Sequence, residues 1–176
     1  MSIVLQSTSG GSVTINEPTT ASNFTQTLPA STGTVMVSGN MPAFSAYGSV
    51  SQSVSSGTVT KVVLQTEEFD TASCFDNSTN YRFTPNVAGY YQINGQIVSG
   101  GSVITRILVG IYKNGVINKW GVDLASGGRA NVSSIIYLNG TTDYVELYGL
   151  VSATSPTFAG SATQDDYFNG CLVRVA

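Results

Sequence analysis

The spacing of apolar residues constrains the fold of this chain more than any other feature of its sequence. Between residues 90 and 98, apolar Tyr91, Ile93 and Ile97 alternate with Gln and Asn. Because successive side chains of a β-strand point to opposite faces, this stretch predicts a strand with one buried and one solvated face. No segment of the sequence keeps a helical period, and Gly, Asn, Asp, Ser and Thr separate the short apolar runs. This pattern predicts an all-β sandwich or barrel.

Further runs of the same kind predict the other strands. Asn114-Gly115 joins two of them, and this dipeptide is a hairpin signal because both residues readily take positive φ. Residues 153–167 separate the last two runs and are expected to form a long loop without regular structure. The predicted strands are 43–50, 58–66, 90–98, 103–112, 116–124, 130–138, 143–152 and 168–175.

The composition restricts the classes of partner. The chain has 176 residues, enough for one buried core with a short appendage. Charged residues make up 10 % of it, the net charge is −3, and the seven Lys and Arg residues are scattered singly. Nucleic acid and anionic membranes require clustered positive charge, so neither is an expected partner. The N-terminus lacks a basic region followed by a long apolar core, so we expect neither a signal peptide nor membrane insertion.

The residues that usually carry catalysis or bind metals are scarce. The chain has no His, which removes the usual general base and metal ligand, and no pattern pairs its carboxylates. Cys74 and Cys171 are far apart and form no CxxC motif, which argues against zinc and thioredoxin-type chemistry. Two free thiols are favoured, although a pair stays open. We expect no enzyme activity and no catalytic or metal residues.

Two predicted strands, 103–112 and 143–152, are apolar on both faces. One sandwich has a single interior, so the second face of such a strand needs another cover. The most economical cover is another copy of the chain, because burying one such side chain stabilises by roughly 1.5–3 kcal/mol. The alternative is that Tyr144 and Tyr148 lie half-exposed under a loop. The residues expected at an interface between copies are Tyr144, Tyr148, Leu150, Tyr112 and Leu108.

Residues 1–41 differ in composition from the rest of the chain. They are rich in Thr, Ser, Pro and Gly, with short apolar alternations at Val13/Ile15 and Val35/Val37. Short strands are expected there, but large apolar residues are too few for a separate core. We interpret this segment as an appendage that is ordered by contact with something else.

The stretch from Phe75 to Ile93 carries a resemblance to a known family. It combines Phe75-Asp76, Phe83-Thr84-Pro85 and a Val-x-Gly-x-Tyr-x-Ile run. Together with 42–49 and 167–175, it resembles the C1q/TNF-like domain, whose blocks are Tyr/Phe-Asp, Thr-Gly-x-Phe-Thr-x-Pro and Val-x-Gly-x-Tyr-x-Phe. The sequence departs from that pattern in one extra residue before Phe83, in a missing Gly and in Ile93 for an aromatic residue.

This resemblance covers residues 42–176. It implies a ten-strand jelly-roll sandwich that forms a homotrimer around a threefold axis. Pro85 and Gly89 suit a strand end and a close turn. We therefore expect Phe75, Phe83 and Tyr91 to meet in one aromatic cluster, and their role to be structural.

The N-terminal segment resembles a second group of proteins. No collagen-like Gly-x-y stem precedes the C1q/TNF-like part; residues 28–34 read LPASTGT instead. Thr- and Pro-rich β segments that end in this way are similar to those of phage tail-fibre and related virion proteins. The resemblance implies that residues 1–41 attach to other tail or baseplate proteins. The chain is then a tail-fibre or fibre-tip subunit, located in the virion and made in the host cytoplasm.

The predicted function is adhesion of this virion protein to a host-surface glycan or protein, with three weak sites on one head raising avidity. Two alternatives stay open. One is a cellular C1q/TNF-like binding module, which would require a secretion route; the other is a virion decoration or connector protein without host contact.

Four residues are candidates for contact with a receptor. Trp120 is the only tryptophan and could stack on a sugar ring, although such a residue can equally belong to the core or an interface. Arg129 lies in a predicted loop and could hydrogen-bond a polar ligand. Asp165 and Asp166 could bind calcium if trimer symmetry supplied the six to eight oxygens that this ion requires; otherwise they are solvated loop acids.

Overall fold

The chain divides into two compact units, Met1–Gly33 and Thr34–Ala176. Among the described residues no helix is long and apolar enough to cross a membrane. In the second unit, Met36 packs against the hydrophobic core. The computed structural model describes residues 3–16, 19–20, 22–23, 25, 27, 30, 32–33, 35–37, 39, 41–160 and 165–176.

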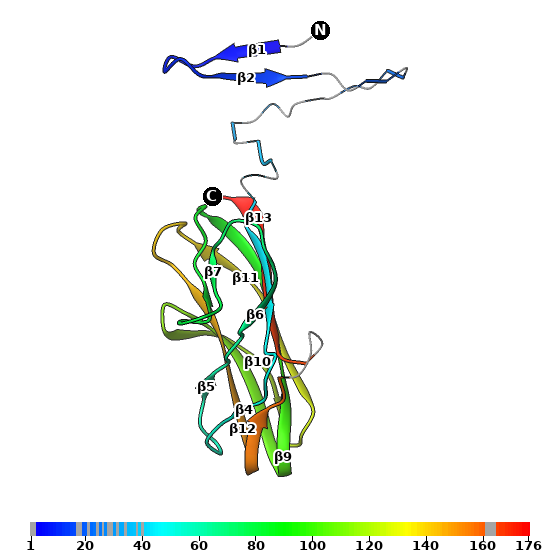
Figure 1. Ribbon diagram of the computed structural model, residues 1–176, viewed down its shortest axis with the longest axis vertical. Coiled ribbons are helices and arrows are strands. Elements are labelled where there is room, and N and C mark those ends of the chain that lie inside the picture. The colour runs from blue at the N-terminus through cyan, green and yellow to red at the C-terminus, as the bar shows by residue number, and fades with distance from the viewer. Residues whose placement is uncertain are drawn as a thin grey trace. The chain divides into compact units, whose positions relative to one another are not determined.

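The first unit contains a two-stranded antiparallel hairpin (Figure 1). Its strands are β1 (Ile3–Gln6) and β2 (Ser12–Ile15). The turn takes Gly10 to a φ of 88°, a left-handed conformation that glycine adopts without strain. The Ser7 amide donates a hydrogen bond of 2.7 Å to the Gly11 carbonyl. The expected alternation at Val13 and Ile15 thus lies in a strand, whereas Val35–Val37 forms none.

The second unit is a sandwich whose central strand is β9 (Gly89–Lys113) (Figure 1). The first half of β9 pairs with neighbours in what we call sheet I, and its second half pairs with others in sheet II. All pairings are antiparallel. The order in sheet I is β6 (Thr66–Asp70), β3 (Ala43–Tyr47), β13 (Tyr167–Val175), β9 and β11 (Arg129–Leu138).

Sheet II is less regular at the edge beyond its strand β12. β10 (Val116–Leu124) lies on one side of β9 and β12 (Val145–Phe158) on the other. The far side of β12 pairs with three separate two-residue strands, so the described part of this unit has eleven strands where ten were expected. The short strands are β4 (Gln52–Ser53), β5 (Thr60–Lys61) and β8 (Arg82–Phe83), the last of which pairs with β7 (Phe75–Asp76).

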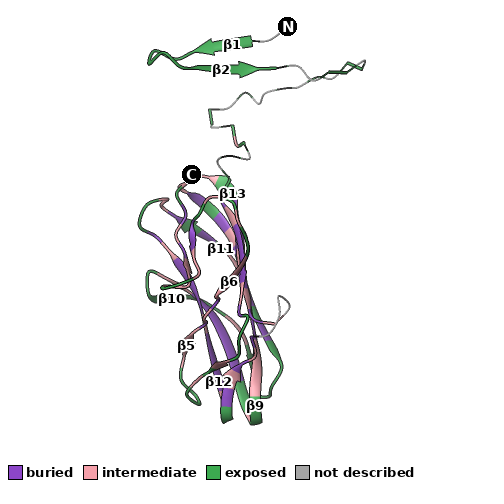
Figure 2. Ribbon diagram, viewed as in Figure 1, coloured by how far each residue is buried: buried purple, intermediate pink, exposed green. Residues whose placement is uncertain are grey.

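An aromatic cluster around Phe44 forms one part of the core. The Phe44 ring centroid lies 4.3 Å from that of Phe83, 5.1 Å from that of Phe75 and 5.3 Å from that of Phe168. Phe83 in turn contacts Tyr91 at 5.5 Å. The prediction that Phe75, Phe83 and Tyr91 meet is confirmed. The buried residues form one hydrophobic cluster, and Figure 2 shows them in purple along the strands of the sandwich.

The second half of the chain departs from the predicted strands in two places. Residues 90–98 and 103–112 belong to one strand, β9, which bends at Gly101 and Val103, both at positive φ. The prediction of a loop throughout 153–167 was wrong because β12 continues to Phe158. That extension pairs with both β9 and β4 and buries the Phe158 ring, so polar Ser and Thr residues here belong to a paired strand.

The Asn-Gly turn is confirmed. Asn114 and Gly115 have φ values of 53° and 77°, and they connect β9 directly to β10. The strand predicted at 58–66 is reduced to Thr60–Lys61 before β6 begins at Thr66. The residues between are nevertheless held to the sandwich, because the Val62 amide donates to the Leu147 carbonyl at 2.9 Å.

Candidate binding site

The alternation of side chains along β9 shows which residues lie on the outer face of sheet II. Ile107, Val109 and Ile111 have no exposed surface, so the residues between them point away from the core. The strand register then places residues from four distant segments beside one another on this outer face. One row across the sheet contains Trp120 on β10, Gly110 on β9, Tyr148 on β12 and Lys61 on β5.

Three aromatic side chains on this face, Trp120, Tyr112 and Tyr148, form what we call the aromatic corner. The Tyr112 and Tyr148 rings are stacked, with 4.0 Å between centroids and 26° between planes. The Trp120 ring is nearly perpendicular to that of Tyr112, at 85° and 6.2 Å. Trp120 lies against Gly110, where a Cβ atom would come within 2.7 Å of Trp120 Cε3. The glycine leaves room for the indole, and Trp120 remains 48 % exposed.

Charged pairs border the aromatic corner. Lys61 Nζ donates to Glu146 Oε1 at 2.5 Å, and Glu146 is buried beside Tyr112 in the register. Farther along the β9–β10 hairpin, the Arg106 guanidinium donates to both carboxylate oxygens of Asp123 at 2.9 and 2.7 Å. These hydrogen bonds lower the pKa of Asp123. Burial, followed by the nearby Glu146 carboxylate, raises the pKa of the Tyr148 hydroxyl.

This arrangement suits a ligand that has one apolar face and polar edges. The corner offers an exposed indole as one wall and a pair of stacked phenol rings as the other, and aromatic rings of this kind bind flat apolar surfaces. The Arg106–Asp123 pair supplies donors and acceptors near the rim. Trp120 was predicted as a receptor contact. The charged pairs were missed, although the Asn-Gly turn already brings Arg106 and Asp123 close in the hairpin.

The residues predicted to face another copy lie in and around the same corner. The single chain already buries Leu108 and Leu150, which are 7 % and 5 % exposed. Tyr112, Tyr144 and Tyr148 are half-buried, and Arg82 lies over the Tyr144 ring at 4.3 Å. Much of the second apolar face of β9 and β12 is thus already covered within a single chain. Contact between copies through these five residues stays a prediction.

The other predicted receptor residues lie away from the corner. Arg129 and Asp165 form an ion pair at 3.1 Å. Asp166 is only 2 % exposed. One of its carboxylate oxygens accepts a hydrogen bond from the Val98 amide at 2.6 Å, and the other accepts one from the Gly160 amide at 2.8 Å. Burial raises the pKa of Asp166 to about 6. This carboxyl therefore fastens the end of β12 and the start of β13 to β9.

Calcium binding by Asp165 and Asp166 stays a prediction. Asp165 accepts a hydrogen bond from Arg129, and Asp166 accepts one from the Val98 amide. Within residues 3–16, 41–160, 165–176 and the described positions between them, no group of three or more His, Cys, Asp or Glu residues could hold a metal ion. Cys74 is buried and Cys171 is exposed, and both are free thiols, as favoured from the sequence.

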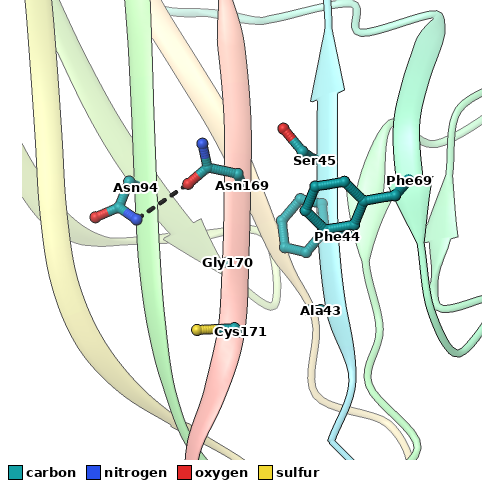
Figure 3. A pocket seen from close by; sticks show the side chains of 8 residues that line it. All are labelled: Ala43, Phe44, Ser45, Phe69, Asn94, Asn169, Gly170 and Cys171. Atoms are coloured by element: carbon teal, nitrogen blue, oxygen red, sulfur yellow. Dashed lines mark hydrogen bonds between the residues drawn. The ribbon is translucent and has the colours of Figure 1, made fainter. Parts of the chain in front are cut away.

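The outer face of sheet I contains a shallow pocket of about 250 Å³ (Figure 3). Its polar side is formed by the Asn94 amide, which donates to Asn169 Oδ1 at 3.0 Å. Its apolar side includes the Phe69 ring, which is half-exposed. Sequence reasoning missed this pocket because Phe69 follows two glutamates in a stretch without clear alternation. The pocket is lined by Ala43, Phe44, Ser45, Phe69, Asn94, Asn169, Gly170 and Cys171.

Several exposed apolar side chains share this face with the polar Asn94–Asn169 pair. Each exposes at least two fifths of its surface, whereas Leu108 and Leu150 on sheet II are buried. Tyr90 and Tyr137 contact each other across β9 and β11, with ring centroids 5.5 Å apart. Sheet I therefore presents an uncovered apolar surface on its outer face. Its exposed residues are Phe69, Tyr90, Ile135, Tyr137 and Val173.

Comparisons with known proteins identify the fold. No family model matches the chain, and no curated protein matches it. The crystal structure of murine APRIL at pH 8.5 superposes with a TM-score of 0.57 at 9 % identity, covering 76 % of this chain and 99 % of the chain in that structure. The structure of Eiger TNF from S. frugiperda has a TM-score of 0.58 at 9 % identity, covering 78 % of this chain and 95 % of the chain in that structure. The sandwich is a C1q/TNF-like jelly roll. At this level of identity the likeness extends to the fold alone.

Proposed function

We propose that this chain is a homotrimeric phage tail-fibre or fibre-tip subunit that binds a host-surface glycan. In this proposal residues 1–41 attach the protein to other tail or baseplate proteins of the virion, and the jelly roll is the adhesive head. The chain is made in the host cytoplasm and acts in binding, not in catalysis. The fibre-like composition of the N-terminal segment and the C1q/TNF-like fold, which suits a binding module, support the proposal.

The observation that carries the binding role is the aromatic corner. Trp120 is half-exposed on a paired strand, held over Gly110 and beside the Tyr112–Tyr148 stack. An open surface of this kind binds a single sugar unit weakly. Three copies on one rigid trimer raise the avidity for a repetitive surface by a factor of roughly 10²–10⁴ when all can engage together.

In this proposal the contact between copies lies on the outer face of sheet I, as an alternative to the five sheet II residues predicted from the sequence. The apolar side chains exposed on this face of the single chain are Phe69, Tyr90, Ile135, Tyr137 and Val173. Exposed apolar patches mark association surfaces. This choice leaves the aromatic corner on sheet II free for a ligand.

The binding role is tested with the full chain on an array of bacterial capsular and lipopolysaccharide glycans. We expect binding to a defined subset of glycans, and loss of at least tenfold in affinity for Trp120→Ala. Val116→Ala, which changes an exposed side chain at the start of the same strand, is the matched control and should bind as wild type. Because Trp120 is the only tryptophan, its fluorescence reports binding directly. No glycan bound above the Trp120→Ala background would overturn the glycan role.

The trimer and the virion location have separate tests. Light scattering on the full chain at micromolar concentration should return three times the mass of 18.4 kDa. Antibody labelling of intact phage particles should mark the tail fibres. Labelling confined to the capsid or baseplate would favour the decoration or connector role, and a protein found only in host cells would favour the cellular C1q/TNF-like module.

A further inference from the structure

The N-terminal hairpin has one aliphatic face. The register pairs Ile3 with Ile15 and Leu5 with Val13, and because these positions are two residues apart on each strand, all four side chains point to the same side. We call these four residues the hairpin face. Each of them exposes more than half of its surface, and Figure 2 shows both strands as exposed along their whole length.

Such a hairpin requires a cover. An isolated two-stranded hairpin is at best marginally stable in water, and it becomes stable when a hydrophobic face packs against something. Burial of each aliphatic side chain contributes roughly 1.5–3 kcal/mol. The opposite side has one aliphatic residue, Val4, beside Thr14, Gln6 and Ser12. The hairpin face, with four aliphatic side chains, therefore gains more from being covered.

The chemistry of the segment indicates what covers it. Residues 1–16 contain no charged residue, so the hairpin face suits an uncharged apolar partner, and an identical face on another copy of the chain is such a partner. Four aliphatic side chains bury roughly 60–120 Å² each. That area falls well below the roughly 800 Å² per partner that holds two free proteins together. Copies tethered to one trimeric head, however, meet at an effective concentration in the millimolar range.

We propose that the hairpin faces of different copies of the chain pack against one another, forming a second interface between copies that is separate from the jelly roll. This inference rests on the homotrimer of the proposed function. The packing encloses Ile3, Leu5, Val13 and Ile15 and leaves the opposite side of the hairpin and its open strand edges to the virion attachment.

Cysteine cross-linking in the full chain tests this interface. The background is Cys171→Ser, which leaves only the buried Cys74. Because Cys171 lines the pocket on sheet I, light scattering first compares the mass of this background with that of wild type. In it, Val13→Cys places a small apolar thiol on the hairpin face. Thr14→Cys places the same thiol on the opposite side of the same strand and is the matched control. Under a mild oxidant we expect Val13→Cys to form disulfide-linked dimers in up to two of every three chains, independent of protein dilution within the micromolar range. Thr14→Cys should stay largely monomeric under denaturing conditions.

The outcomes separate this inference from the proposed function. Equal cross-linking of the two variants, or none in Val13→Cys, overturns the hairpin interface. If light scattering then still returns a trimer, the proposed trimer stands without it; a monomer overturns both. The emission spectrum of Trp120 on each variant verifies that the jelly roll is intact, so misfolding is distinguished from a missing contact.

Discussion

Replacing Gly110 by Ala should displace the Trp120 ring while leaving the stability of the sandwich nearly unchanged. The new Cβ would come within 2.7 Å of Trp120 Cε3 and 2.9 Å of Ile117 Cδ1, so these side chains must move. Trp120 is half-exposed and can rotate into solvent. Overpacking costs about 1–3 kcal/mol where neighbours cannot move, and Ala is favoured over Gly within a strand by about 0.5–1 kcal/mol. We therefore expect an unfolding free energy within about 1 kcal/mol of wild type.

Gly95→Ala on the same strand is the matched control. Its Cβ would collide with the Leu147 side chain, which has no exposed surface. Because that neighbour is enclosed by the core, we expect the full overpacking cost of about 1–3 kcal/mol. For a chain of this size, each kcal/mol lowers the melting temperature by about 2–4 °C.

Two measurements at equal protein concentration distinguish the variants. Urea unfolding gives the free energies, and the emission of Trp120, the sole tryptophan, reports on its contact with Gly110. Gly110→Ala should shift that emission to longer wavelength and lose glycan binding with little loss of stability. Gly95→Ala should keep the emission and lose stability. A Gly110→Ala protein with unchanged emission, or one less stable than Gly95→Ala, would show that the indole does not rest on this glycine.

Three further predictions concern the core, a buried carboxyl and the thiols. Phe44→Ala removes the ring at the centre of the aromatic cluster and should cost about 3–5 kcal/mol in urea unfolding, whereas Val116→Ala should stay within about 0.5 kcal/mol. Because the pKa of folded Asp166 is raised to about 6, its contribution to stability is greatest below about pH 4 and is lost as the pH rises to about 6. The urea midpoint of Asp166→Asn should therefore change less between about pH 4 and pH 6 than that of wild type. An equal change in both proteins would refute the raised pKa of Asp166. Iodoacetamide should leave buried Cys74 unmodified in the native protein, because burial raises its thiol pKa, and should alkylate it after unfolding; mass spectrometry showing modified Cys74 in the native protein would contradict its burial.

Local patterns were sufficient to predict much of the fold. The alternation in 90–98 predicted which residues of β9 enter the core, because side-chain direction in a strand depends only on the parity of the position. The Asn114-Gly115 turn predicted the β9–β10 hairpin for a similarly local reason. The polar extension of β12 to Phe158 could not be predicted this way. Its strand conformation comes from pairing with β9 and β4.

The candidate site was predicted only in part. Trp120, Tyr112 and Tyr148 were each singled out from the sequence, but for different roles: one as a receptor contact and two as an interface between copies. The structure places them in one corner. The Tyr112–Tyr148 stack joins strands whose pairing no turn signal specifies.

The sequence by itself determined that this chain is all-β, where its main turn lies and which side of β9 faces the core. Each of these depends on residues close together in the chain. Only the tertiary structure decided that Lys61 meets Glu146, that Trp120 rests on Gly110 and that Asp166 is buried. Those contacts join distant segments, and their register is set by how the whole core packs between the two sheets.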